Sequence, residues 1–155
     1  MEVHEDQDRI ETVVDLAAPV ARVWRAITDH EEFGVWFRVQ LDGPFRVGET
    51  TTGNITSAGH EQMRWESLTE KMDHERVFAF SWQPSLIDPD TTYSADARVL
   101  VEFRLEATDA GARLTIFETG FKQFPASKRL EVLRSCAEGW ELQAANIAAH
   151  VSCER

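Results

Sequence analysis

Glu118 is the residue whose type and position are best suited to chemistry in this sequence. Leu114, Ile116 and Glu118 alternate along one predicted strand, so the Glu118 side chain points to the same face as two apolar neighbours. A carboxyl group on that face would be desolvated, which raises its pKa and allows it to act as a general acid or base. We favour the alternative, in which Glu118 lies at the end of the strand, solvated or paired with an arginine such as Arg64.

Two further residues could take part in chemistry with Glu118. His60 and Tyr93 fall in predicted loops that could reach the mouth of a cavity. The sequence contains no nucleotide-binding glycine loop, nucleophile elbow or zinc motif. Its five histidines fall in predicted turns or termini without metal-ligand spacing; they are His4, His30, His60, His74 and His150. We therefore expect no metal site and no cofactor.

A long helix near the C-terminal end is the element most able to position a site. Its apolar residues recur at steps of three and four; they are Leu130, Leu133, Ala137, Trp140, Ala144, Ile147 and Val151. This spacing places them on one stripe of an α-helix. The stripe mixes alanines and Gly139 with bulky side chains, so its contact with a sheet would be uneven. A sheet that packs against one long helix can therefore enclose a cavity.

The rest of the chain is typical of strands, interrupted by short helices. Alternating or β-branched residues predict strands over 10–16, 41–45, 49–56, 62–70, 77–82, 98–105 and 113–119. Helical spacing predicts a short helix over 19–28, and Asp29 could cap a second helical turn through Phe33 or Gly34. Successive hairpins imply a curved antiparallel sheet, so the fold class is α+β.

The segment 83–97 is much longer than a hairpin connection needs. It contains two prolines, three aspartates and Tyr93. We expect a flexible loop, which is either a plain surface insertion or a cover over a binding site.

Length and charge restrict the class of protein. The 155 residues fit one domain, 1–155, with 1–9 as a flexible N-terminus. The net charge of −11 argues against nucleic acid or an anionic membrane as a partner. No signal peptide or membrane span is predicted. Cys136 and Cys153 would lie about 25 Å apart along one helix, too far for a disulfide, and reduced cysteines favour the cytoplasm.

Short motifs carry a resemblance to a known family. They are Ala18-Pro19, Val23-Trp24, Thr28-Asp29, Trp36-Phe37, Thr119-Gly120-Phe121, Pro125, Glu138-Gly139-Trp140, Asn146-Ile147 and His150-Val151. In order and spacing, over about 10–151, the chain resembles the AHSA1-like branch (activator of heat-shock chaperone ATPase homologue) of the SRPBCC superfamily, which includes START domains and the Bet v 1-like birch-pollen allergens. The resemblance implies a helix-grip fold, in which a seven-stranded antiparallel sheet wraps around the long C-terminal helix with an apolar cavity between them. It implies less about activity, because the superfamily includes lipid carriers, hormone receptors, cyclases and co-chaperone domains.

Three functions remain open on the sequence alone. The first is binding of a hydrophobic or aromatic small molecule in the cavity, with micromolar affinity. The residues expected to line it are Trp36 and Phe37 near the entrance, and Trp65, Phe78, Phe80, Trp82, Val101, Phe103, Ile116, Leu133, Ala137 and Trp140. The second is a cyclase- or dehydratase-type enzyme that uses Glu118 with His60 or Tyr93. The third is a stress-related, co-chaperone-like protein that binds a protein partner, and an exposed strand edge would also allow a weak homodimer.

Overall fold

The computed structural model describes residues 8–152, and most of the predicted flexible segment 1–9 lies outside them, as does Cys153. The strands are β1 (Arg9–Leu16), β2 (Val39–Leu41), β3 (Thr50–Ile55), β4 (Arg64–Asp73), β5 (Val77–Trp82), β6 (Val99–Thr108) and β7 (Gly111–Thr119). The helices are α1 (Val20–Thr28), α2 (His30–Phe37) and α3 (Ala126–Ser152), with 3₁₀ turns η1 (Pro84–Leu86) and η2 (Phe121–Gln123).

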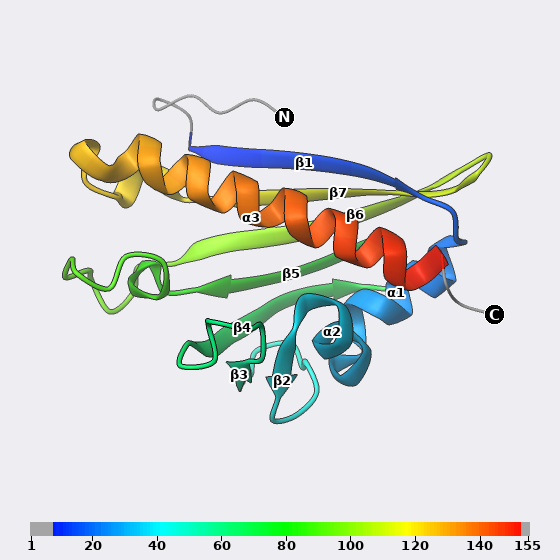
Figure 1. Ribbon diagram of the computed structural model, residues 1–155, viewed down its shortest axis with the longest axis horizontal. Coiled ribbons are helices and arrows are strands. Elements are labelled where there is room, and N and C mark those ends of the chain that lie inside the picture. Colours follow the sequence, from blue (N-terminus) through cyan, green and yellow to red (C-terminus); the bar gives the residue numbers. More distant parts are fainter. Residues whose placement is uncertain (1–7, 153–155) are drawn as a thin grey trace.

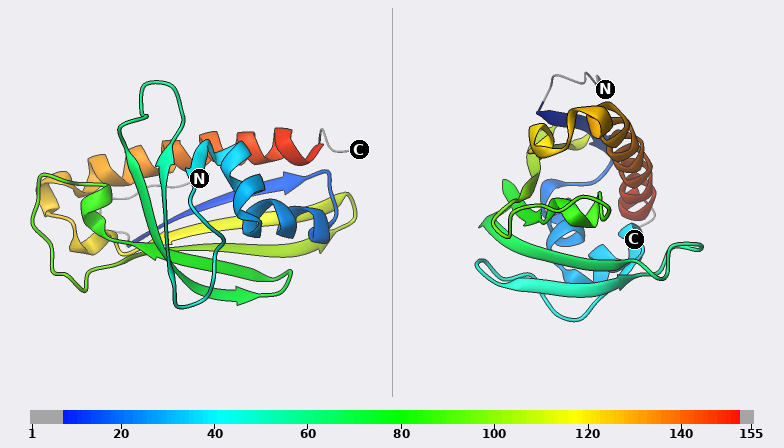
Figure 2. Two further views of the ribbon diagram at one scale, coloured as in Figure 1. Left: turned by 90° about the horizontal axis from the view of Figure 1, so that it is seen from below. Right: turned by 90° about the vertical axis from the view of Figure 1, so that its left-hand side faces the viewer.

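The strands form one antiparallel sheet that curves around α3. Their order is β1-β7-β6-β5-β4-β3-β2, so only β1 lies out of sequence order, beside β7. Helix α3 runs along the concave face, with α1 and α2 near its C-terminal half (Figure 1). The view along the helix shows the sheet bending around it (Figure 2). This arrangement confirms the predicted helix-grip fold.

The two short helices follow from local sequence. Pro19 precedes α1, and the Asp29 side chain caps α2 by accepting the backbone N–H groups of Glu31 and Glu32. Helix α2 extends to Phe37, past the predicted end at Phe33 or Gly34. The extra turn forms because its aromatic side chains pack inward, and the Trp36 indole donates to the Ala26 carbonyl oxygen at 2.8 Å.

One predicted strand boundary was wrong. The strand predicted over 41–45 is β2, which ends at Leu41, and an irregular segment containing Gly43 and Pro44 follows it. Proline has no N–H to offer a strand ladder, which explains the early end. Helix α3, the long C-terminal helix that the sequence predicted, begins at Ala126, directly after Pro125. The segment 83–98 is irregular apart from η1, as predicted.

The core divides into two clusters along α3. The larger one is rich in aromatic residues from α2 and the sheet, including Phe33, Phe78 and Phe103, which are fully buried. The smaller one lies under the N-terminal half of α3 and consists of Ile10, Val99, Phe121, Phe124, Leu133 and Ala137. Trp82 packs against both clusters.

Candidate functional site

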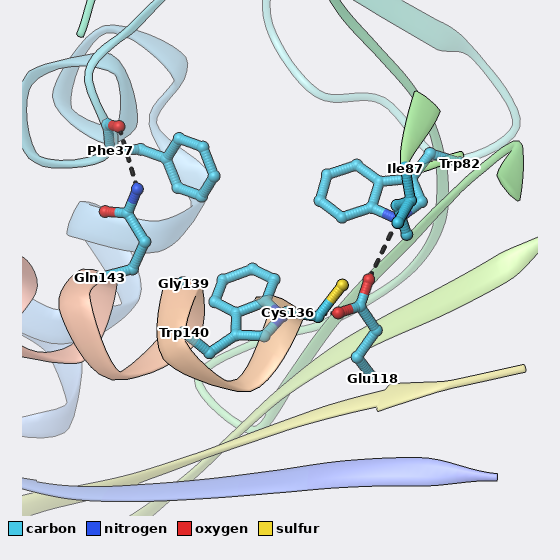
Figure 3. A pocket seen from close by; sticks show the side chains of 8 residues that line it. All are labelled: Phe37, Trp82, Ile87, Glu118, Cys136, Gly139, Trp140 and Gln143. Atoms are coloured by element: carbon cyan, nitrogen blue, oxygen red, sulfur yellow. Dashed lines mark hydrogen bonds between the residues drawn. The ribbon is translucent and has the colours of Figure 1, made fainter. Parts of the chain in front are cut away.

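A pocket opens beside Trp82, between the sheet and α3 (Figure 3). Its cavity volume is about 180 Å³, and its surface is almost wholly apolar. The residues that line it are Phe37, Trp82, Ile87, Glu118, Cys136, Gly139, Trp140 and Gln143. The pocket therefore draws on α2, β5, the 83–98 loop, β7 and α3.

Helix α3 supplies half of this lining. Cys136 lies three and four positions before Gly139 and Trp140, and Gln143 lies four and three positions after them, so the four residues share one face. A Cβ atom placed on Gly139 would meet no other atom within 4 Å, so this glycine leaves open space where a side chain would fill it. Gln143 joins this face to α2, because its Nε2 donates to the Phe37 carbonyl oxygen at 3.2 Å.

Glu118 is the one carboxyl group in the pocket lining. Its residue is only 1% exposed, because β7 directs it to the same face as Leu114 and Ile116. Trp140 Nε1 donates to Oε1 at 2.8 Å, and Trp82 Nε1 donates to Oε2 at 3.1 Å. The two indole rings are nearly parallel, with 15° between their planes and 6.5 Å between their centroids. Figure 3 shows both indoles turned toward the carboxyl group.

The environment of Glu118 changes its acidity. Burial raises the pKa of Glu118 to about 7, although the hydrogen bonds from Trp140, Trp82 and Cys136 act in the opposite direction. Burial also raises the pKa of Cys136, and the neighbouring Glu118 adds to the effect, so this thiol is a poor nucleophile. The favoured expectation that Glu118 is solvated or paired at the strand end is wrong, because its side chain is buried on the face that the alternation with Leu114 and Ile116 indicated. The pairing with Arg64 is not formed, since Arg64 donates to Asn54 at 3.0 Å.

The two proposed partners of Glu118 lie elsewhere. His60 is exposed in the turn before β4, and it does not line the pocket. The Tyr93 hydroxyl donates to Asp88 Oδ2 at 2.6 Å, and its ring packs edge-on against Phe124. The structure therefore does not bring His60 or Tyr93 to Glu118.

The 83–98 loop is fastened to α3 beside the pocket. Lys128 Nζ contacts Asp88 Oδ1 at 3.1 Å and donates to Thr91 Oγ1 at 2.8 Å. The hydrogen bond from Tyr93, together with those from Thr91 and Lys128, lowers the pKa of Asp88 to about 2. Burial and the bond to Asp88 raise the pKa of Tyr93 to about 12. This cluster fixes the segment that places Ile87 in the pocket lining.

The residues predicted to line a cavity fall into two groups. Phe37, Trp82 and Trp140 line the pocket. The others lie in the core clusters outside its lining; they are Trp36, Trp65, Phe78, Phe80, Val101, Phe103 and Ile116 in the larger cluster, and Leu133 and Ala137 in the smaller one. Ligand contact by any of them stays a prediction.

Sequence reasoning left Ile87, Cys136 and Gln143 out of the lining. The helical spacing from Trp140 could have indicated Cys136 and Gln143, which lie four positions before it and three after it. No pattern could have indicated Ile87, because its place depends on the path of an irregular loop.

Other kinds of site find little support in the part of the chain that the structure describes. Within residues 8–152, no helix is long and apolar enough to cross a membrane. In the same range, no three histidine, cysteine, aspartate or glutamate side chains are grouped to hold a metal ion.

Several solved structures share this fold. Ms6760 from Mycobacterium smegmatis aligns with a TM-score of 0.74 at 19% identity, over 98% of this chain and 96% of that one. MLL2253 from Mesorhizobium loti aligns with a TM-score of 0.73 at 16% identity, over 95% and 98% of the two chains. DynU16, a protein in the dynemicin biosynthetic locus, aligns with a TM-score of 0.71 at 18% identity over 94% of this chain. The chain spans about half of DynU16, 48% of its length. No curated protein matches the sequence.

A sequence comparison with protein families extends this result beyond the fold. The family described as Activator of Hsp90 ATPase homolog 1-like protein matches residues 17–152. This span includes both short helices, β2 to β7, α3 and every residue that lines the pocket. The match confirms the resemblance to the AHSA1-like branch of the SRPBCC superfamily that the sequence motifs indicated. The chain belongs to the Activator of Hsp90 ATPase homolog 1-like protein family.

Proposed function

We propose that this protein binds a small apolar or aromatic molecule in the pocket between the sheet and α3. The observation that carries the proposal is an apolar cavity of about 180 Å³ walled by the rings of Phe37, Trp82 and Trp140. A dry cavity of about 150 Å³ inside another protein takes up benzene. The biosynthetic locus of DynU16 is consistent with a small organic ligand for this fold.

The expected affinity is modest. Burying apolar ligand surface contributes roughly 25 cal/mol per Å², and association costs several kcal/mol. A ligand small enough for this pocket should therefore bind in the micromolar range at best. The 83–98 loop contributes Ile87 to one wall, so its attachment to α3 helps to hold that wall of the open pocket in place.

The first test compares mass spectra of the purified protein under native and denaturing conditions, to detect a co-purified small molecule. A titration with tert-butylbenzene then follows the indole N–H signals of Trp82 and Trp140 by ¹H–¹⁵N NMR. We expect both signals to shift in a saturable way. Gly139→Leu should weaken this binding by narrowing the pocket, whereas Ala149→Leu, at an exposed position of the same helix, should not. Equal binding by both variants would contradict the assignment of the pocket.

A second candidate function is acid–base catalysis of the cyclase or dehydratase type by Glu118. It is favoured by one observation, that a buried carboxyl group with a pKa raised to about 7 lines the pocket. A group with a pKa near the working pH exchanges protons most effectively. A carbon-detected NMR titration would measure this pKa, and an ordinary value of about 4.3 would contradict the candidate. A co-chaperone-like protein partner, a homodimer and a cytoplasmic location stay predictions.

A further inference from the structure

We infer that the pocket selects ligands that carry a positively charged nitrogen, such as a substituted ammonium group on an apolar or aromatic body. This inference rests on the proposed function, since it names the chemical class of the molecule that the pocket would bind. Three features of the site support it: an acid without a cationic partner, a set of aromatic rings, and the charge of the surroundings.

The first feature is the set of partners around the Glu118 carboxyl group. Within residues 8–152, its hydrogen-bond partners are Trp82, Trp140 and Cys136, and none of them carries a positive charge. The remaining lining residues add no cation either; they are Phe37, Ile87, Gly139 and Gln143. A buried carboxylate is stable when a countercharge accompanies it. A cationic ligand would supply the countercharge that the lining does not.

The second feature is the aromatic wall next to this acid. Trp82 and Trp140 are nearly parallel, and the Phe37 ring is tilted by 66° to Trp140 with 6.1 Å between the centroids. The face of an aromatic ring attracts a cation within about 6 Å of its centroid, most strongly for tryptophan. Sites that recognise alkylated ammonium groups combine several such rings. Here the rings and the carboxyl group border one cavity (Figure 3).

The third feature is that the carboxyl group can still accept contacts. The two oxygens of a carboxylate have four lone pairs together, and those of Glu118 receive three hydrogen bonds, from Trp82, Trp140 and Cys136. Indole nitrogens donate only and do not titrate, so they hold the carboxylate in place without neutralising it. An anionic ligand would meet this carboxylate without a basic residue in the lining. The net charge of −11 also raises the local concentration of cations.

The test compares two probes of nearly the same shape, phenyltrimethylammonium and tert-butylbenzene. The first has a positively charged nitrogen where the second has a neutral carbon. Binding is followed at pH 8 through the indole N–H signals of Trp82 and Trp140. We expect the cation to bind at least tenfold more tightly than the hydrocarbon. In Glu118→Gln this preference should fall to about twofold or less, because the charge is gone while one acceptor oxygen remains.

The outcomes separate the two proposals. Equal or tighter binding of tert-butylbenzene, or a preference that survives in Glu118→Gln, overturns the cation inference and leaves the binding pocket standing. Absence of a shift with either probe overturns both.

A measurement on the unaltered protein covers the case in which Glu118→Gln does not fold. Only the ionised form of Glu118 attracts the cation, so the affinity for phenyltrimethylammonium should rise about tenfold from pH 6 to pH 8, given a pKa of about 7. The other titratable side chain in the lining is Cys136, whose raised pKa keeps it protonated over this range. The side chains that line the pocket from β5, α2 and the 83–98 loop are neutral. The residues paired with Glu118 in the sheet, Ile10 of β1 and Val101 of β6, are neutral as well. Binding of tert-butylbenzene should not rise with pH, and a flat profile for the cation would overturn the inference.

Discussion

The two regions beneath α3 are both built from aromatic residues, yet one is filled and the other is hollow. At the filled end, the Phe33 ring contacts five other rings, those of Trp36, Phe37, Phe45, Trp65 and Phe103. The hollow end is the pocket beside Trp82. There α3 has Gly139 in place of a larger residue, and the Glu118 carboxyl group accepts hydrogen bonds from two indole N–H groups. Aromatic content therefore does not decide whether a cavity exists. The absence of a side chain at Gly139 and the hydrogen bonds that Glu118 accepts from the two indoles decide it.

The largest effect should come from the filled end. Phe78 is fully buried and contacts the rings of Phe45, Phe80 and Phe103. Phe78→Ala should lower the free energy of unfolding by about 3–5 kcal/mol through the cavity it leaves. Urea denaturation measures this loss. Phe117→Ala, on the partly exposed face of β7, is the matched control and should cost clearly less. A loss below about 1 kcal/mol for Phe78→Ala would mean that this end is also loosely packed.

The next effect concerns Glu118, the buried carboxyl group of the hollow end. Because burial raises the pKa of Glu118 from 4.5 to about 7, the folded state favours the protonated form. Its contribution to stability is complete below pH 4.5 and is lost as the pH rises through 7. The difference between the two pKa values corresponds to about 3 kcal/mol.

Urea denaturation between pH 4.5 and pH 8 would measure this decline. Glu118→Gln removes the titrating group. The difference in the free energy of unfolding between the variant and the unaltered protein should therefore change by about 3 kcal/mol over this pH range. A constant difference across the range would show that Glu118 is solvated and that the hollow end is wet.

A smaller effect should follow from filling part of the hollow. Alanine favours a helix over glycine by about 1 kcal/mol, and a Cβ at position 139 meets no obstacle. Gly139→Ala should therefore stabilise the protein by up to that amount while weakening the binding of tert-butylbenzene. Ser135→Ala, at an exposed position of α3, should also stabilise slightly but leave binding unchanged. Stabilisation by Gly139→Ala without weaker binding would separate this glycine from the site.

The smallest effect on stability should come from the attachment of the 83–98 loop. The Lys128 side chain is 40% exposed, so its ion pair with Asp88 contributes at most about 1 kcal/mol. Lys128→Met should nevertheless speed hydrogen exchange in 83–98 and shorten the lifetime of a bound probe, since Ile87 belongs to this loop. Lys122→Met, at an exposed lysine in η2, serves as the control. Unchanged exchange in Lys128→Met would show that the loop is held by other contacts.

The sequence predicted the filled end better than the hollow one, for physical reasons. Alternation with a period of two directs Glu118 inward as soon as Leu114 and Ile116 are buried, and the apolar stripe of α3 follows in the same way. Burial could therefore be predicted residue by residue. The pocket could not, because its lining depends on which side chains meet across β5, β7 and α3.

Local competition explains the remaining errors. The predicted helical turn ended at Phe33 or Gly34, yet the packing of Trp36 and Phe37 against the core extends α2 to Phe37. The predicted strand 41–45 has the apolar residues Leu41 and Phe45 at its ends, but Pro44 interrupts the hydrogen-bond ladder. Ile87 reaches the pocket because Asp88 is fixed to Lys128, a contact between segments 40 positions apart.

The arrangement of the α3 lining also bears on how this family could diversify. Cys136, Gly139, Trp140 and Gln143 lie within one stretch of a single helix, whereas the sheet residues behind them carry most of the packing. Changes confined to 136–143 could remodel ligand preference and leave the stability of the scaffold largely intact. Natural drift, or a small mutagenic library, could therefore explore new specificities along one short segment of the gene.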